Sequence, residues 1–326
     1  MQADSAVTDG LCNPQVTIDA RQLLGLICRK GGAACPLIGE TRANAILERL
    51  ANDPTVAIRL TSDAEELPHY TRVEEHADAE DALDRLRDLK VLQRLGLCPG
   101  DTRRARYLVE LLFERVASPW GICAHDTEGW EGCEPARSGA YESVRDAGWR
   151  EVVYCRGDEE MAQFRQRNER AIAEDEGLFI RPHHLMCMSC WYNGGDVAMY
   201  PRPNDTLAEV LERIQREPDV PITLVEGPCE ACDCCDGYHP ETGRCVHAGG
   251  LIRDYLKDLE VFQRIGLMPG DTRPAREILD LIYDRIESTT DICGYGDGEV
   301  TAEEWRVCGG PSGNAGYART RETGVF

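Results

Sequence analysis

Apolar positions recur along this chain in two similar series, each with the spacing of several helices and one strand. After Asp101, and again after Asp271, apolar residues three or four positions apart predict an amphipathic helix that the aspartate can cap. A longer helix precedes each aspartate and ends at Gly96 or Gly266, because glycine is a common C-cap residue. Shorter helices are expected at 19–30, 41–52, 181–192 and 205–216, and strands at 56–60 and 220–225.

The two series belong to an internal repeat. Segment 87–102 (R-D-L-K-V-L-Q-R-L-G-L-C-P-G-D-T) recurs at 257–272 as K-D-L-E-V-F-Q-R-I-G-L-M-P-G-D-T. Such self-similarity indicates a tandem duplication of a unit of about 140 residues. We predict a mostly helical α+β fold with a first repeat at 1–150, a linker with a charged helix at 151–177 and a second repeat at 178–326. Because each repeat offers about one strand, we expect the strands to meet about a pseudo-twofold axis, or to pair with residues of the cysteine-bearing tails.

Charge excludes one class of partner. The 58 acidic and 36 basic residues give a formal net charge of −22, which repels polyphosphate, so we expect no nucleic-acid partner.

No apolar run approaches the roughly 18 residues that a membrane span needs, so we expect no membrane partner. The N-terminal residues do not resemble a secretory signal, so we expect a cytoplasmic protein with reduced thiols. Its 16 cysteines then point to metal binding or redox chemistry before disulfides.

Three cysteine positions are filled in both repeats, and each repeat has a fourth cysteine nearby. The first set is Cys28, Cys35, Cys123 and Cys133, and the second set is Cys187, Cys190, Cys293 and Cys308. Since Cys187 and Cys190 are three positions apart, a helix places both on one face. We expect Cys12, Cys98 and Cys155 to be ordinary thiols that bind no metal.

Further cysteines occur in the second repeat alone, and they indicate an additional site there. They are Cys229, Cys232, Cys234, Cys235 and Cys245. The C-x-x-C spacing lets two thiolates reach one metal or cluster, and we take Cys235 rather than Cys234 as a further ligand. Scattered single cysteines beside glycines favour one to three [4Fe–4S] clusters per chain, with these cysteines as iron ligands. Zinc is the alternative.

The second repeat resembles a family of small bacterial and archaeal proteins of uncharacterised function that are predicted to bind iron–sulfur clusters. The resemblance rests on segments 181–187 (R-P-H-H-L-M-C), 227–232 (G-P-C-E-A-C), 243–245 (G-R-C), 292–293 (I-C) and 305–308 (W-R-V-C). It implies that the cysteines of these segments hold clusters. Gly296 stands where the family has a further cysteine, as does Asp126 in the first repeat, and both departures reduce the ligand set of the tail.

The pair His183-His184 stands one helical turn before Cys187. Either imidazole could ligate iron, donate a hydrogen bond to a cluster or act as an acid–base catalyst. The alternative is that the pair only bonds to backbone groups and sets the turn after Pro182.

Three functions follow from these features. The first is an iron–sulfur protein of an anaerobe that acts in electron transfer or as a redox accessory, docking through its acidic surface to a redox partner protein. The second is an enzyme in which an open iron binds a small-molecule substrate, with dehydratase- or desulfidase-like chemistry. The third is a zinc-stabilised binding module.

Overall fold

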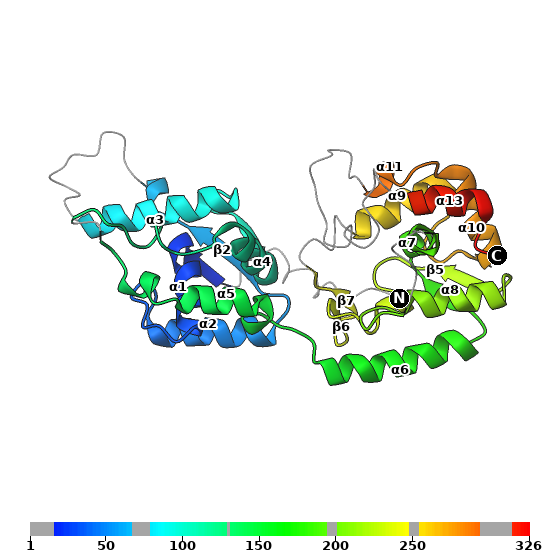
Figure 1. Cartoon of the computed structure of the whole chain (residues 1–326), viewed down its shortest axis with the longest axis horizontal. Coiled ribbons are helices and arrows are strands. Elements are labelled where there is room, and N and C mark those ends of the chain that lie inside the picture. Colours follow the sequence, from blue (N-terminus) through cyan, green and yellow to red (C-terminus); the bar gives the residue numbers. More distant parts are fainter. Residues whose placement is uncertain (1–15, 67–78, 129–130, 194–200, 248–253, 294–314) are drawn as a thin grey trace, which may run out of the picture. The chain divides into compact units, whose positions relative to one another are not determined.

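The computed structural model describes residues 16–66, 79–128, 131–193, 201–247, 254–293 and 315–326. The chain forms two compact units, Met1–Cys155 and Arg156–Phe326 (Figure 1). Both are mostly helical with small mixed sheets, which confirms the predicted α+β class.

The first unit begins with a strand that leads directly into its central helix. Its elements are β1 (Val16–Asp19), α1 (Ala20–Lys30), α2 (Glu40–Asn52), β2 (Ala57–Thr61), η2 (Asp63–Glu66), α3 (Ala79–Leu95), β3 (Thr102–Arg104), α4 (Ala105–Arg115), η3 (Glu134–Arg137), α5 (Ala140–Ala147) and η4 (Trp149–Glu151).

The second unit follows the same order after one additional helix. Its elements are α6 (Asp158–Glu174), β4 (Leu178–Ile180), α7 (Pro182–Tyr192), α8 (Leu207–Arg216), β5 (Pro221–Leu224), η5 (Glu230–Cys232), β6 (Tyr238–His239), β7 (Arg244–Cys245), α9 (Leu256–Ile265), β8 (Thr272–Pro274), α10 (Ala275–Arg285), α11 (Thr290–Cys293) and α13 (Ala315–Thr323).

Each unit builds its own three-stranded sheet, with one parallel and one antiparallel pair. In the first unit β2 pairs with β1 and β3, with Ile58 opposite Arg103. In the second unit β5 pairs with β4 and β8, with Ile222 opposite Arg273. The expectation of about one strand per repeat is therefore wrong, and in the described residues every strand pairs within its own unit. The strands that the pattern missed are only two to four residues long.

The predicted caps have mixed outcomes. Gly96 and Gly266 end α3 and α9 with φ values of 67° and 72°, in the left-handed region that favours glycine. Asp101 and Asp271, however, do not cap helices, because β3 and β8 come first. Each aspartate instead accepts a hydrogen bond of 2.8 Å from the backbone N–H three residues earlier, which closes the turn into the strand.

One buried helix forms the centre of each unit. Helix α1 contacts α2, α3 and α5, and helix α7 contacts α8, α9 and α13 (Figure 1).

Helix α6 belongs to the second unit and packs on α8, where the Asn168 amide donates a 2.7 Å hydrogen bond to Thr206. The segment expected to be a solvated linker is thus partly anchored.

A buried tyrosine recurs in the two units. The hydroxyl of Tyr141 donates to the carbonyl of Val116 at 2.8 Å, and that of Tyr317 donates to the carbonyl of Ile286, also at 2.8 Å. Both carbonyls lie immediately beyond a helix, where no further helical N–H is available. The tyrosines therefore satisfy equivalent backbone groups and join α5 to α4 and α13 to α10.

Replacing Tyr317 with Phe should destabilise the second unit by about 1–2 kcal/mol, because a buried carbonyl loses its donor. Differential scanning calorimetry would show a lower unfolding midpoint for that unit. Tyr192→Phe is the matched control, since Tyr192 is 37% exposed and should tolerate the loss of its hydroxyl. Equal midpoints for Tyr317→Phe and the wild type would contradict this assignment.

Candidate metal centres

The first unit gathers four buried cysteines from three segments. Cys28 lies on α1, Cys35 in the turn after it, and Cys123 and Cys133 in the loop between α4 and η3. None of the four is more than 4% exposed. The thiol of Cys35 interacts with those of Cys28 and Cys133, and Cys123 lies within electrostatic range of Cys133. All four residues that the sequence singled out here therefore come together.

The backbone holds two of these cysteines in register. The N–H of Cys133 donates to the carbonyl of Cys123 at 2.9 Å, and the Arg87 guanidinium donates to the same carbonyl at 3.1 and 3.3 Å. Gly132 has a φ of 71°, and a Cβ there would lie 2.3 Å from the Cys123 carbonyl oxygen. Glycine is required for this close approach.

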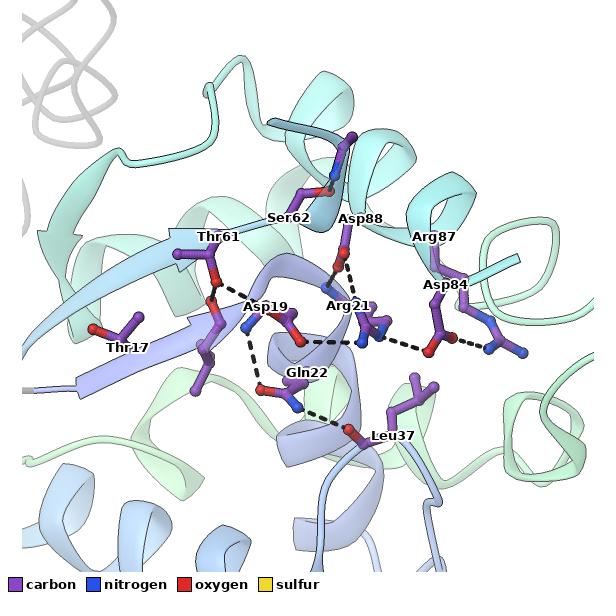
Figure 2. A network of polar contacts seen from close by, with 12 residues as sticks. Thr17, Asp19, Arg21, Gln22, Leu37, Thr61, Ser62, Asp84, Arg87 and Asp88 are labelled. Carbon is purple, nitrogen blue, oxygen red and sulfur yellow. Dashed lines mark hydrogen bonds and ion pairs between the residues drawn. The ribbon is translucent and has the colours of Figure 1, made fainter. Parts of the chain in front are cut away.

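A polar network joins the start of the central helix to Asp84, Arg87 and Leu37 (Figure 2). Arg21 pairs with Asp88 at 2.6 Å and with Asp84 at 3.2 Å, and Asp84 also binds Arg87. Gln22 donates to the carbonyl of Leu37, whose own N–H donates to the sulfur of Cys35. The network thus reaches the cluster through both Arg87 and Leu37.

Cys35, Cys123 and Cys133 favour their neutral thiol forms in the metal-free unit, because their pKa values are raised. Burial raises the pKa of Cys123 to about 12. A hydrogen bond with Cys35, together with burial, raises the pKa of Cys133. Since metals and clusters bind thiolates, loading this site must release protons.

The second unit keeps part of this arrangement. Cys190 and Cys293 are buried and lie within electrostatic range of Tyr317, as Cys28 and Cys123 do with Tyr141. Cys308, predicted as a further ligand of this set, lies outside the described residues, as do Trp305, Gly296 and Cys12.

A different thiol and imidazole group lies at the start of α7. The sulfurs of Cys229 and Cys232 are 4.0 Å apart, and Nδ1 of His184 lies 3.2 Å from the Cys229 sulfur. These three ligand atoms all lie within 4.8 Å of one another, close enough to bind one metal ion. Cys187 follows His184 by three positions and so shares its face of the helix.

Buried charges support this group. The guanidinium of Arg181 pairs with Asp258 at 2.5 Å, and Nδ1 of His183 lies 2.7 Å from the other oxygen of Asp258. Burial lowers the pKa of His183 and that of His184, so both favour the neutral imidazole. His183 is 3% exposed and bound to a carboxylate, which gives it a positioning role. His184 is the histidine that faces the thiols.

Cys235 and Cys245 form separate groups around His247 rather than joining Cys229 and Cys232. The sulfur of Cys235 lies 3.6 Å from Nε2 of His247, and that of Cys245 lies 3.3 Å from Nδ1. Cys234 is fully buried and interacts electrostatically with Arg165, Asp205 and Cys235, and it belongs to none of the metal-ligating groups of the described residues.

Sequence reasoning missed three residues here: His247, Asp236 and Asp254, which join Cys235 or Cys245 in these groups. The available signal was spacing. His247 follows Cys245 of strand β7 by two positions, which would place both side chains on one face. The chain thus offers several sets of metal-ligating side chains.

Comparisons with known proteins add no family to this description. No family model matches the chain, and neither a curated protein nor a solved structure matches it significantly. Within the described residues, the helices are too short or too polar to cross a membrane.

The interaction between Cys229 and Cys232 can be tested in metal-free protein through the pH dependence of Cys232 alkylation. The hydrogen bond with Cys229, together with the charge of Arg181, lowers the pKa of Cys232 to about 7. Alkylation of Cys232 by iodoacetamide should therefore rise through a midpoint near pH 7 and slow as the thiolate is protonated below it. Cys229→Ala should move this midpoint toward the ordinary thiol value of about 8.5.

Peptide mapping by mass spectrometry would follow each thiol separately, with exposed Cys98 as the internal reference. A Cys232 midpoint that equals the ordinary value, or that does not move in Cys229→Ala, would contradict this thiol pair.

Proposed function

We propose that this chain is an iron–sulfur protein that acts in electron transfer or as a redox accessory. The observation that carries the proposal is the meeting of Cys28, Cys35, Cys123 and Cys133 in a buried, all-thiol cluster. Four thiolates are the usual ligand set of a [4Fe–4S] cluster. Such a cluster would supply a one-electron redox couple.

Within the part of the chain that the structure describes, the compact ligand groups that would suit a single zinc ion lie in the second unit rather than in the first. A tetrahedral zinc with bonds of 2.3 Å separates two sulfurs by about 3.8 Å. The groups of three or more ligand atoms within 4.8 Å of one another, searched over the described residues, all lie in the second unit. Among the described residues, no three first-unit thiols lie this close together, although Cys35 interacts with both Cys28 and Cys133. We take the absence of a compact three-ligand group there as support for several iron atoms rather than one zinc ion.

The chain's own residues would tune this centre. Burial lowers the local dielectric, and hydrogen bonds to sulfur, such as that from Leu37 to Cys35, favour the thiolate form. The net charge of −22 would repel anionic partners and attract a basic patch on a redox protein. The resemblance of segments 181–187 and 227–232 to a predicted iron–sulfur family supports the same function for the second unit.

A specific observation favours zinc as the second candidate for the group at α7. The 4.0 Å between Cys229 and Cys232 and the 3.2 Å from His184 to Cys229 are close to the edges of a tetrahedral metal site. A structural zinc there, with Cys187 as the fourth ligand, would make the second unit a binding module. An open-iron enzyme has less support, because His183 is buried against Asp258.

Replacing Cys133 with Ser should remove iron and acid-labile sulfide from anaerobically prepared protein, because the first-unit site then has three thiols. The loss should be close to four irons per chain if that site holds one [4Fe–4S] cluster. Cys98→Ser, at an exposed cysteine of the same unit, is the matched control and should keep the wild-type content.

Iron and sulfide assays, with the visible absorption spectrum, would measure both variants. Equal iron and sulfide in Cys133→Ser and the wild type would contradict a cluster at this site. Zinc without sulfide in the wild type would favour the binding module instead.

A further inference from the structure

The imidazole of His247 lies between two sets of metal-ligating atoms, and one set has unusually regular geometry. Nε2 of His247 is 3.6 Å from the sulfur of Cys235 and 3.4 Å from Oδ1 of Asp236. The same sulfur and the same carboxylate oxygen are 3.6 Å apart. One nitrogen, one sulfur and one oxygen therefore form a nearly equilateral triangle.

This triangle has the dimensions of one face of a tetrahedral zinc site. With bond lengths of 2.3 Å to sulfur and about 2.1 Å to nitrogen and oxygen, the tetrahedral edges are about 3.6 Å for sulfur to nitrogen, 3.4 Å for nitrogen to oxygen and 3.6 Å for sulfur to oxygen. The three distances around His247 agree with each of these edges. A zinc ion would fit without moving the side chains.

The surrounding backbone holds the triangle in place. A Cβ at Gly237 would lie 2.0 Å from the His247 ring, so the ring packs directly on this glycine. The N–H of Gly237 donates to the Cys235 sulfur at 3.3 Å, which favours the thiolate. Its carbonyl accepts from the N–H of Val246 at 2.7 Å, so the hairpin of β6 and β7 fixes the spacing of Cys235 and His247.

The opposite ring nitrogen is also engaged. Nδ1 of His247 lies 3.3 Å from the sulfur of Cys245, which can accept a hydrogen bond from Nδ1–H and so fix the tautomer that leaves the Nε2 lone pair available. The side chains of His247 and Asp236 are 18% and 13% exposed, which leaves a path for an ion from solvent.

We propose that Cys235, Asp236 and Nε2 of His247 form a mononuclear zinc site that is separate from the cysteine clusters. Three protein ligands from thiolate, carboxylate and imidazole leave the fourth tetrahedral position for water or for an atom of a small-molecule ligand. Sites of this kind differ from closed structural zinc sites, because the fourth ligand can exchange. This assignment gives Cys235 and Cys245 roles other than cluster ligation and does not depend on iron binding.

The test uses the metal-free full chain, loaded with excess zinc and freed of weakly bound ions by gel filtration. Native mass spectrometry would then count zinc ions per chain. We expect His247→Ala and Asp236→Ala to hold one zinc fewer than the wild type. Gly237→Ala, which keeps every ligand but displaces the ring, should lose the same ion. Cys234→Ser, next to Cys235 but outside the ligand group of His247, should keep the full count.

Cys245→Ser separates this site from one on the Nδ1 side of the ring. If Cys245 orients His247 and does not bind the metal, its loss should leave the count at saturating zinc unchanged and weaken affinity by about 10–100-fold. Loss of one ion in Cys245→Ser but none in Asp236→Ala would place the metal with Cys245 and Asp254 and overturn the proposal. So would an unchanged count in both His247→Ala and Gly237→Ala. Far-UV circular dichroism would establish that each variant is folded.

Discussion

A buried aspartate on the neighbouring helix holds the start of the central helix in each unit. Asp88 on α3 and Asp258 on α9 have fully buried side chains, and each accepts a hydrogen bond from a backbone N–H at the start of α1 or α7. A buried carboxylate is costly unless it is paired. In the second unit the partner Arg181 also interacts with Cys232, so this pairing links the start of α7 to the thiols there.

The side chains that pair with the buried aspartate differ between the two units, and so do the candidate metal ligands nearby. In the first unit Arg21 occupies the second position of the helix and binds Asp88. The candidate ligands of that unit are then cysteines only. In the second unit His183 takes that position and shares Asp258 with Arg181, while His184 turns toward Cys229. The first unit has Arg21-Gln22 where the second unit has His183-His184. This exchange adds an imidazole to the candidate metal ligands of the second unit, whose ligand groups are therefore more varied in chemistry.

Sequence patterns predicted the helices from α1 to α4 and from α6 to α10, and they singled out the first-unit cysteine set, because periodicity and the internal repeat can be read directly from the sequence. They did not predict α5 or α13. They missed β3 and β8, since three-residue strands such as Thr102–Arg104 have no alternation to detect. Asp258 was visible as a repeated residue, but its burial and its pairing with Arg181 depend on the packing of α9 against α7. His247 was missed because it has no counterpart in the first repeat and becomes a candidate only when the hairpin brings it to Cys235.

The central claim is that buried thiols of this chain hold iron–sulfur clusters. The most direct measurement is the content of iron, zinc and acid-labile sulfide per chain in protein purified without oxygen, with its visible spectrum. The account predicts iron and sulfide in equal amounts, at about four of each per cluster, with visible absorption. A colourless protein without sulfide, even after anaerobic reconstitution with iron and sulfide, would contradict it.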